Sequence, residues 1–245
     1  MTLPKPYFER DGITLYHADA RHILPLLHGV DWAVVSDVPY GVQYVHGEGG
    51  GCLAQSTRFS GIAIIGDDAP FNPENLLELG LPMILWGANH YASRLPDSPC
   101  WLVWDKRDGV CSNDQADCEL AWTSLKSPAR LKRLLWNGML KATERGEARQ
   151  HPTQKPVALI KWCLSFFPDA KIILDPFCGS GTTLVAAKLD GRKAIGIEID
   201  ERYCEISARR LEQGVLDFAG AAQRYRQPPV AEHYSVRERP APAKE

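Results

Sequence analysis

Apolar and polar positions along the chain alternate, or gather into short runs, in a way that predicts strands separated by helices. Strand-like runs occupy residues 12–17, 31–36, 83–86, 101–104, 171–174 and 193–198. Helix-like spacing is found over residues 20–27, 157–167, 183–189 and 201–213. Strands that alternate with helices are typical of a parallel sheet covered on both faces. We therefore expect an α/β fold, a doubly wound and mostly parallel sheet, in one domain over residues 1–226.

Two segments depart from this pattern. Residues 47–51 are rich in glycine and are expected to form a loop. Residues 227–245 are rich in proline and charge and are expected to be a disordered tail. Trp86, Trp101 and Trp104 alternate with apolar neighbours and are expected in the core.

Composition narrows the class of protein. The 245 residues are 44% apolar and 24% charged, as in an ordinary globular protein. Neither a signal peptide nor a membrane-spanning run is evident, so we expect a cytoplasmic protein that does not contact a membrane. None of the seven cysteines has C-x-x-C spacing, so we expect neither a disulfide framework nor a metal site.

Charge is distributed unevenly along a chain whose net charge is −2. Residues 126–155 contain two acidic residues, both Glu, and eight basic ones: Lys126, Arg130, Lys132, Arg133, Lys141, Arg145, Arg149 and Lys155. Such a basic strip is typical of contact with a phosphate backbone. A solvated helical face is the alternative.

A glycine pair, Gly179 and Gly181, lies between a strand-like run and a helix-like segment, where backbone N–H groups can face an anion. A phosphate-binding P-loop would require a lysine that is absent here, and a dinucleotide site would place a third glycine where Leu184 stands. A nucleoside-type cofactor requires acids for an amino group and for ribose hydroxyls. Asp175 before the loop and Glu198 at the end of the next strand meet that requirement.

The sequence Asp-Pro-Phe-Cys-Gly-Ser-Gly-Thr-Thr at 175–183 closely resembles the S-adenosylmethionine motif of the DNA amino-methyltransferases. His-Pro-Thr-Gln-Lys-Pro at 151–156 resembles the element that precedes it in the beta class, where the catalytic half comes first. The resemblance spans residues 10–213 and implies a circularly permuted, Rossmann-like methyltransferase fold. It also implies the cofactor S-adenosyl-L-methionine, with Asp175 at the methionine amino group and Glu198 at the ribose.

The same resemblance places Asp19 near the cofactor adenine and makes Lys155 and Thr182 candidates for the methionine carboxylate. It includes Phe177, Gly179 and Gly181 in the cofactor loop.

Asp37-Val38-Pro39-Tyr40 supplies the parts needed to methylate an exocyclic amine, whose lone pair is delocalised into the ring. A carboxylate on Asp37 and the carbonyl of Val38 can accept the two amino hydrogens, while Pro39 keeps Val38 extended. Tyr40 can stack on a base flipped out of double-stranded DNA. The family usually has proline at position 38, so the valine predicts a softer turn and reduced activity.

Aspartate at position 37 favours adenine N6 as the target. Cytosine N4 methylation, a catalytically weak or inactive DNA-binding homologue, and methylation of RNA or a protein amide stay as alternatives, and a homodimer is compatible with each. A C5-cytosine enzyme would require a nucleophilic cysteine, and Cys100 lacks the surrounding motif. Target recognition is expected within residues 42–150. Five residues there could read bases, although residues of these types are more often found in turns or on the surface: Asn89, Asp105, Lys106, Asn113 and Gln115.

Overall fold

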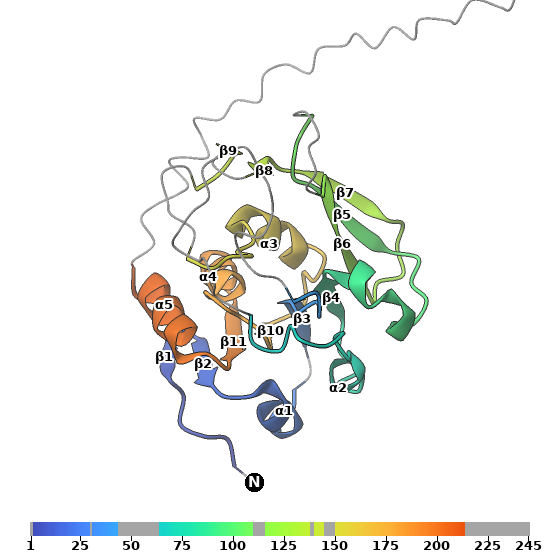
Figure 1. Cartoon of the computed structure of the whole chain (residues 1–245). Coiled ribbons are helices and arrows are strands. Elements are labelled where there is room, and N and C mark those ends of the chain that lie inside the picture. The colour runs from blue at the N-terminus through green and yellow to red at the C-terminus, as the bar shows by residue number, and fades with distance from the viewer. Residues whose placement is uncertain are drawn as a thin grey trace, which may run out of the picture. The chain divides into compact units, whose positions relative to one another are not determined.

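Figure 1 shows a computed structural model of the whole chain. The structure describes residues 2–29, 31–43, 64–109, 116–137, 140–144 and 150–213. Residues 1–213 form one compact unit, and residues 214–245 form a second unit that lies outside the described residues. The expected loop at 47–51 and tail at 227–245 also lie outside them, and the domain boundary at 226 stays a prediction.

Within the described residues, nine strands form one sheet in the order β1-β2-β11-β10-β3-β4-β6-β5-β7. In chain order these strands are β1 (Phe8–Arg10), β2 (Ile13–His17), β3 (Trp32–Asp37), β4 (Met83–Trp86), β5 (Trp101–Asp105), β6 (Cys118–Thr123), β7 (Arg130–Arg133), β10 (Ile172–Asp175) and β11 (Lys193–Glu198). A separate antiparallel pair consists of β8 (Trp136–Asn137) and β9 (Leu140–Lys141).

The centre of the sheet is parallel. Strands β2, β11, β10, β3 and β4 all run in one direction. Strand β1 is antiparallel to β2, β6 is antiparallel to both β4 and β5, and β7 is parallel to β5. Strands β3 and β4 lie on one side of β10 and strand β11 lies on the other, so the chain winds in both directions from the centre of the sheet. Strands β3 and β4 also come before β10 in the chain. The expected doubly wound, permuted order is therefore confirmed.

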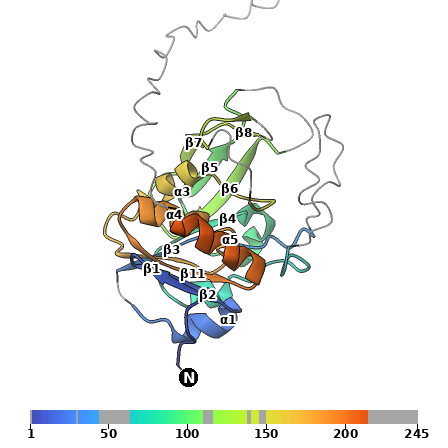
Figure 2. The ribbon, with the colours of Figure 1, turned by 90° about the vertical axis from the view of Figure 1, so that its left-hand side faces the viewer.

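Helices cover both faces of the sheet. They are α1 (Ala20–Ile23), α2 (Glu74–Leu77), α3 (Val157–Leu164), α4 (Thr182–Leu189) and α5 (Glu201–Glu212), with 3-10 turns η1 (Leu24–Leu26), η3 (Ala88–His90) and η4 (Ala92–Arg94). Figure 2 shows α4 and α5 on one side of the strands and α1 on the other. Two apolar cores result, one containing Leu159, Leu184 and Cys204, the other Ile23 and Leu76.

Alternation along the strands explains the two cores. In β3, Ala33 and Val35 join the core under α3, α4 and α5, whereas Val34 faces the core under α1 and α2. Successive side chains of a strand point to opposite faces of the sheet. In a sheet covered on both faces, a short apolar run therefore contributes side chains to both cores.

Strands β5, β6 and β7 extend the sheet on the side of the middle region. Trp86 and Trp104 are buried and meet edge to face at 6.4 Å between ring centroids, which confirms them as core residues, whereas Trp101 is only half-buried. The basic segment Arg130–Arg133 forms the edge strand β7 and not a helix, so the helical-face alternative is wrong there. Charged side chains suit an edge strand because they discourage pairing with another chain.

Among the helices that the structure describes, none combines the length and the apolar character needed to cross a membrane.

Candidate active site

Asp37 and Asp175 end two neighbouring parallel strands, β3 and β10, so their side chains emerge at the same edge of the sheet. The connections from these two strands leave in opposite directions, because β10 leads to β11 on one side and β3 leads to β4 on the other. Such a switch point is where α/β sheets bind ligands. A direct link joins the two strand ends, since the buried Ser36 Oγ donates to Asp175 Oδ1 at 2.7 Å.

The glycine loop after β10 is shaped by two left-handed residues. Gly179 has φ +50° and Gly181, the N-cap of α4, has φ +76°. A Cβ on Gly181 would lie 2.8 Å from Ser207 Oγ, and that hydroxyl donates to the Gly179 carbonyl at 2.8 Å. The loop is therefore held against α5, and only glycine fits at its second position.

Asp175 is 2% exposed and faces into this loop. Its Oδ1 accepts from Ser36 Oγ at 2.7 Å and from the Phe177 backbone N–H at 3.2 Å. Burial raises the pKa of Asp175 to about 6, against the lowering effect of its hydrogen bonds from Thr183 and Ser36. A buried acid beside a glycine loop suits a cationic amino group, which would compensate the cost of its charge.

Glu198 ends β11 and turns back to the loop. Its Oε2 accepts from Gly179 N–H at 2.8 Å, and its Oε1 accepts from Asp200 N–H at 2.8 Å. Burial raises the pKa of this carboxyl, and the two backbone donors lower it. A carboxylate oriented by two N–H groups retains lone pairs for hydroxyl donors such as those of a ribose.

The other expected cofactor residues lie around these two acids. Asp19 caps α1 and forms an ion pair with Arg21, and the N–H of Ala18 next to it donates to the Glu198 carbonyl at 2.9 Å. Thr182 begins α4 and its hydroxyl accepts from Arg210 at 3.2 Å. Phe177 packs edge to face on Phe71 at 5.5 Å between ring centroids. Their roles toward a cofactor stay predictions.

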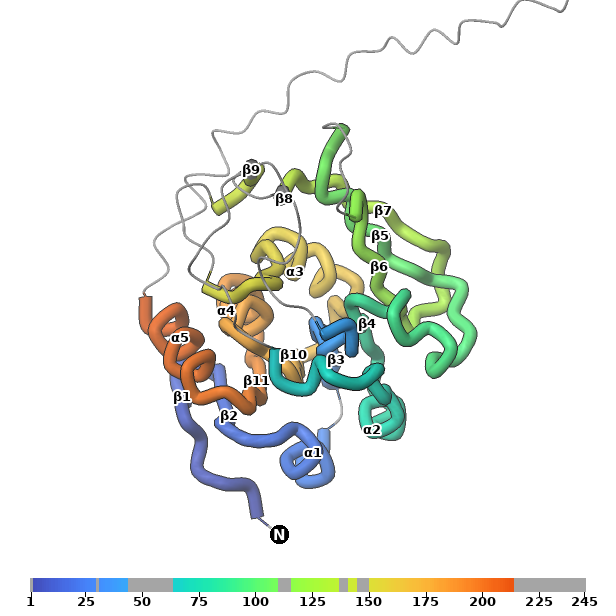
Figure 3. Tube along the Cα trace, viewed as in Figure 1, coloured from blue at the N-terminus to red at the C-terminus, as the bar shows by residue number. Residues whose placement is uncertain are grey.

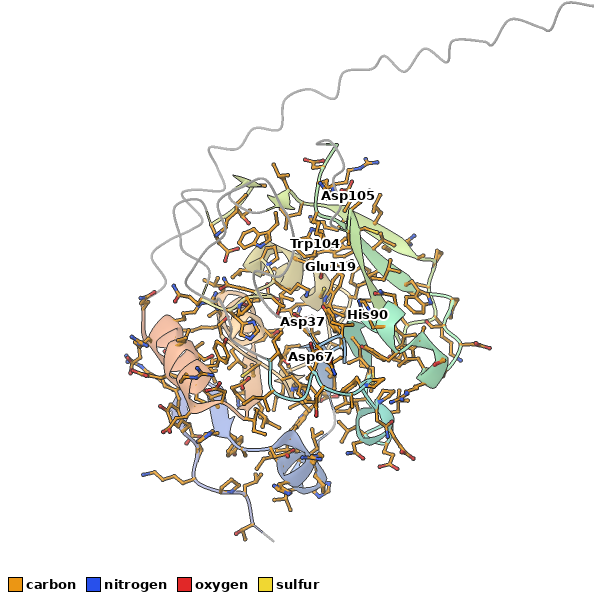
Figure 4. All side chains as sticks on the ribbon, viewed as in Figure 1. Asp37, Asp67, His90, Trp104, Asp105 and Glu119 are labelled. Carbon is orange, nitrogen blue, oxygen red and sulfur yellow. The ribbon has the colours of Figure 1, made fainter. Side chains whose placement is uncertain are left out.

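The segment Asp37–Tyr40 leads the chain out of the end of β3. Val38 is 2% exposed and belongs to the core under α1 and α2. Tyr40 donates its hydroxyl to Asp37 Oδ1 at 2.6 Å, and its ring stacks on that of His90 at 5.1 Å with an interplanar angle of 13°. Figure 4 shows Asp37 near the centre of the molecule with His90 and Glu119 close by.

Asp67 fastens the chain that leaves this turn. Its side chain is 3% exposed, and Oδ1 accepts from the N–H groups of Gly41 at 2.6 Å and Val42 at 3.3 Å. The trace in Figure 3 shows the segment after β3 beside the one that leads into α2. Because two backbone donors depend on it, this buried carboxylate fixes the exit of the turn.

Lys155 lies with the Asp37 turn and not with the glycine loop, which differs from its expected role at a methionine carboxylate. Its Nζ is 2.7 Å from both oxygens of Asp37, 2.9 Å from the Tyr40 hydroxyl and 3.0 Å from Glu119 Oε2. Buried ammonium groups require such anionic partners. Two carboxylates satisfy it here, so its ammonium is directed at the turn and at β6.

His151 connects the same segment to the glycine loop. Its ring packs at 4.4 Å on Tyr203, and its Nδ1 accepts from Thr153 N–H at 3.2 Å. Burial, together with the nearby Lys155, lowers the pKa of His151 to about 4, so the imidazole is neutral at pH 7. A Cβ on Gly179 would lie 3.6 Å from this ring. The segment 151–156 therefore touches both halves of the site.

Several polar residues of the site carry no signal in the sequence: Asp67, His90 and Glu119. Each is isolated among unrelated neighbours and reaches the site only through the fold. Among the candidate base readers, Lys106 pairs with Glu119 at 3.1 Å, and Asp105 caps a turn by accepting from Arg107 N–H at 3.0 Å. Asn89 is exposed in η3, while Asn113 and Gln115 lie outside the described residues.

The fold and the site define a Rossmann-like α/β protein with a glycine-loop ligand site at its topological switch point. Residues 103–209 match a family model for N6 and N4 methyltransferases, described as DNA methylase. The solved structure of PvuII DNA methyltransferase (cytosine-N4-specific) superposes with a TM-score of 0.57, covering 89% of this chain and 93% of that chain at 12% identity. At this identity the likeness shows the fold alone.

Curated relatives agree with the family match. The type II methyltransferase M2.LlaDCHI of Lactococcus lactis subsp. cremoris is 43% identical over 33% of this chain and 30% of its own length. The DNA adenine methyltransferase YhdJ of Escherichia coli (strain K12) is 42% identical over 38% of this chain and 26% of its own length. The type II methyltransferase M.ScaI of Streptomyces caespitosus is 27% identical over 86% of this chain and 84% of its own length.

The matched segment thus spans less than a third of the first two relatives. Together with the permuted strand order, these matches show that the chain resembles the DNA amino-methyltransferases of the beta class.

Proposed function

We propose that this chain transfers a methyl group from S-adenosyl-L-methionine to N6 of an adenine flipped out of double-stranded DNA. One observation carries the proposal: the Asp37 turn and the glycine loop lie at the ends of adjacent strands and are joined through Ser36 and Asp175. A donor at the loop and an amine at the turn would be neighbours, as a direct displacement requires.

The residues around the loop fit this cofactor. Asp175 would bind the methionine amino group, because a buried acid with a raised pKa gains most from a cation beside it. Glu198 would accept from the ribose hydroxyls, and Asp19, Phe177 and Thr182 would line the adenine and loop sides. When bound, S-adenosylmethionine would supply an electrophilic methyl group.

The turn fits an exocyclic amine. Asp37 would accept one N–H of the amino group and the Val38 carbonyl the other, which leaves the nitrogen lone pair free of the ring. Tyr40, already stacked on His90, would present an aromatic surface for the flipped base. Asp37 could also take the proton that the amine releases, since burial raises the pKa of its carboxyl above the ordinary value.

Relatives support adenine as the target, since E. coli YhdJ is a DNA adenine methyltransferase by name. Aspartate at position 37 supports the same choice. Cytosine N4 is the alternative enzyme reaction, because the PvuII neighbour carries that specificity by name.

The basic edge strand β7 would contact phosphates of the duplex. Arg130 and Arg133 are exposed and Lys132 is half-exposed. Of the basic strip, Arg145 and Arg149 lie outside the described residues. Phosphate contacts position a duplex without reading its sequence.

Transfer of labelled methyl groups from S-adenosylmethionine to unmethylated DNA tests the proposal. The wild-type protein should label DNA, and Asp37→Asn should reduce the rate by about a hundredfold or more, because it removes a charged acceptor from the reacting amine. Calorimetry should show that Asp37→Asn binds the cofactor as the wild type does. An unlabelled product with intact cofactor binding would favour the catalytically inactive homologue.

A further inference from the structure

Most acceptor positions of the Asp37 carboxylate are filled by neighbouring side chains. A carboxylate offers about four acceptor positions, two on each oxygen. Oδ1 accepts from the Tyr40 hydroxyl at 2.6 Å and from Lys155 Nζ at 2.7 Å, which fills it. Oδ2 accepts from Lys155 Nζ at 2.7 Å. Within the part of the chain that the structure describes, these contacts leave a single acceptor position, on Oδ2.

Lys155 is itself fixed from the opposite side. Its side chain is 5% exposed, and Glu119 Oε2 lies 3.0 Å from its Nζ. Glu119 comes from β6, two strands away from β3 across the sheet, and its Oε1 lies 3.1 Å from Lys106 Nζ. The side chains of Lys106, Glu119, Lys155 and Asp37 therefore form a row of alternating charge that ends at the catalytic turn.

We propose that Lys155 and Glu119 are positioning residues: Glu119 holds Lys155, and Lys155 restricts Asp37 to one acceptor position, on Oδ2, for the amino group of the target base. This proposal rests on the proposed function. It assigns Lys155 to the base side of the site and gives a function to a residue of β6 that no sequence motif marks.

The chemistry explains why one position matters. The reaction requires one N–H to point at the carboxylate and the other at the Val38 carbonyl, so that the lone pair faces the methyl donor. A carboxylate free to rotate could accept both hydrogens or neither in the right direction. With Oδ1 occupied, rotation would break the two hydrogen bonds that Oδ1 accepts from Tyr40 and Lys155, which are strong because the carboxylate is charged. The arrangement therefore selects one orientation of the amine.

The charged row also affects the proton affinity of Asp37. The titratable groups that face it are Lys155, Tyr40, Glu119, Tyr91 and Asp175. Burial raises the pKa of Asp37 and Lys155 lowers it. For Glu119, the two lysines overcome burial and lower the pKa to about 2, so this residue stays ionised. Removing the ammonium of Lys155 should raise the pKa of Asp37 further.

Lys155→Met and Glu119→Gln test the proposal, with Lys171→Met and Glu205→Gln as controls. Both controls remove the same charge from exposed ion pairs, Lys171 with Asp31 and Glu205 with Arg209. The first measurement is independent of activity: carboxyl NMR of labelled aspartate follows the titration of Asp37, which is identified by its loss in Asp37→Asn. We expect Lys155→Met to raise its midpoint by about one pH unit or more. Neither control should move it.

The second measurement is the rate of methyl transfer against pH. Lys155→Met and Glu119→Gln should each lower kcat by about tenfold or more, with an unchanged KM for the cofactor, and Lys155→Met should move the acidic limb upward. Lys155→Arg keeps the charge, so the acidic limb of its pH profile should lie at the wild-type pH, but its rate should stay below that of the wild type. Thermal unfolding monitors folding of each variant.

The outcomes separate the two proposals. A wild-type protein that transfers no methyl group contradicts the proposed function, whereas an unmoved Asp37 midpoint in a folded Lys155→Met variant overturns the positioning proposal. An active wild type with full kcat in both Lys155→Met and Glu119→Gln would overturn it as well. A cofactor KM that rises severalfold in Lys155→Met would show that Lys155 acts on cofactor binding and would overturn the positioning proposal.

Discussion

Val38 is predicted to weaken the site without removing any of its groups. Its carbonyl is available to an amine, but valine has no ring to fix φ, as the proline usual in the family would. The side chain is 2% exposed, so the core restrains the turn from below. Restraint by packing permits more backbone freedom than a covalent ring.

Val38→Pro should raise the turnover number by about two- to fivefold. A proline that fits its site contributes about 0.4–1 kcal/mol by reducing alternative conformations. Single-turnover methyl transfer under saturating cofactor and DNA measures the effect. An unchanged rate in a stably folded variant would show that the turn is already rigid.

Gly87, which follows β4, supports Tyr40 directly. It has φ +71°, and a Cβ there would overlap the Tyr40 ring. Gly80 has a comparable φ of +62°, yet a Cβ there would meet no atom within 4 Å. The two glycines thus separate backbone strain from contact with the site.

Gly87→Ala should destabilise the fold by about 1–3 kcal/mol more than Gly80→Ala, because it adds overpacking to strain. It should also lower the rate of methyl transfer, since Tyr40 must move. Urea unfolding and the transfer assay measure the two effects. An equal loss of stability in Gly87→Ala and Gly80→Ala would mean that the Tyr40 ring moves aside with little loss of free energy.

At the scale of elements, Asp175 makes the unit β10-loop-α4 less stable when its carboxyl is ionised, because the carboxyl is buried. Its pKa is about 6 in the folded protein, above the ordinary value of 3.8. The folded state therefore binds the proton more tightly than the unfolded chain. Stability is greatest below the unfolded pKa and falls as pH rises through 6, above which the loss, on the order of 3 kcal/mol, is complete.

Asp175→Asn should accordingly be more stable than the wild type at pH 8 and should lack this fall between pH 4 and pH 6. The same variant should lose cofactor affinity by about tenfold or more, on the order of one charged hydrogen bond. Thermal unfolding across pH and calorimetry measure both. A variant that is less stable at pH 8 would show that the hydrogen bonds of Asp175 outweigh its burial.

The elements that could be predicted from the sequence are those with dense local signals. Residues 193–198 form the expected strand because an apolar run ends at an acid, and Asp175–Thr183 has the spacing of a strand, a loop and a helix. Strand β7 escaped prediction because its residues are mostly charged, and an edge strand needs no apolar alternation. For a related reason, the sequence does not predict which side chains Lys155 contacts. Its partners Asp37 and Glu119 lie 118 and 36 residues away, and only the sheet brings them together.

At the scale of the whole molecule, charge is concentrated where a duplex would lie. The net charge is −2, whereas β7 and the segment before it carry exposed basic side chains. Lys171 and Lys193 lie just before or at the start of β10 and β11, at the opposite edge of the sheet from Asp37. Position and not total charge should therefore govern DNA binding.

Arg130→Ala combined with Lys132→Ala should reduce the slope of log K against log salt by about 0.9 for each phosphate that the protein no longer neutralises. Lys171→Ala combined with Lys193→Ala changes net charge equally and should leave the slope unchanged. Fluorescence anisotropy with a labelled duplex between low and moderate salt measures it. Identical slopes of log K against log salt in the two double variants would show that the duplex does not contact β7.

The most direct test of the central claim is to identify the nucleoside that this protein methylates. Unmethylated genomic DNA is incubated with the protein and isotopically labelled S-adenosylmethionine, digested to nucleosides and analysed by mass spectrometry. The account predicts label in N6-methyladenine, and none when Asp37→Asn replaces the wild type. Label in N4-methylcytosine would contradict the assigned base while preserving the site. Label in 5-methylcytosine, or in N6-methyladenine at an equal rate without the Asp37 carboxylate, would contradict the account.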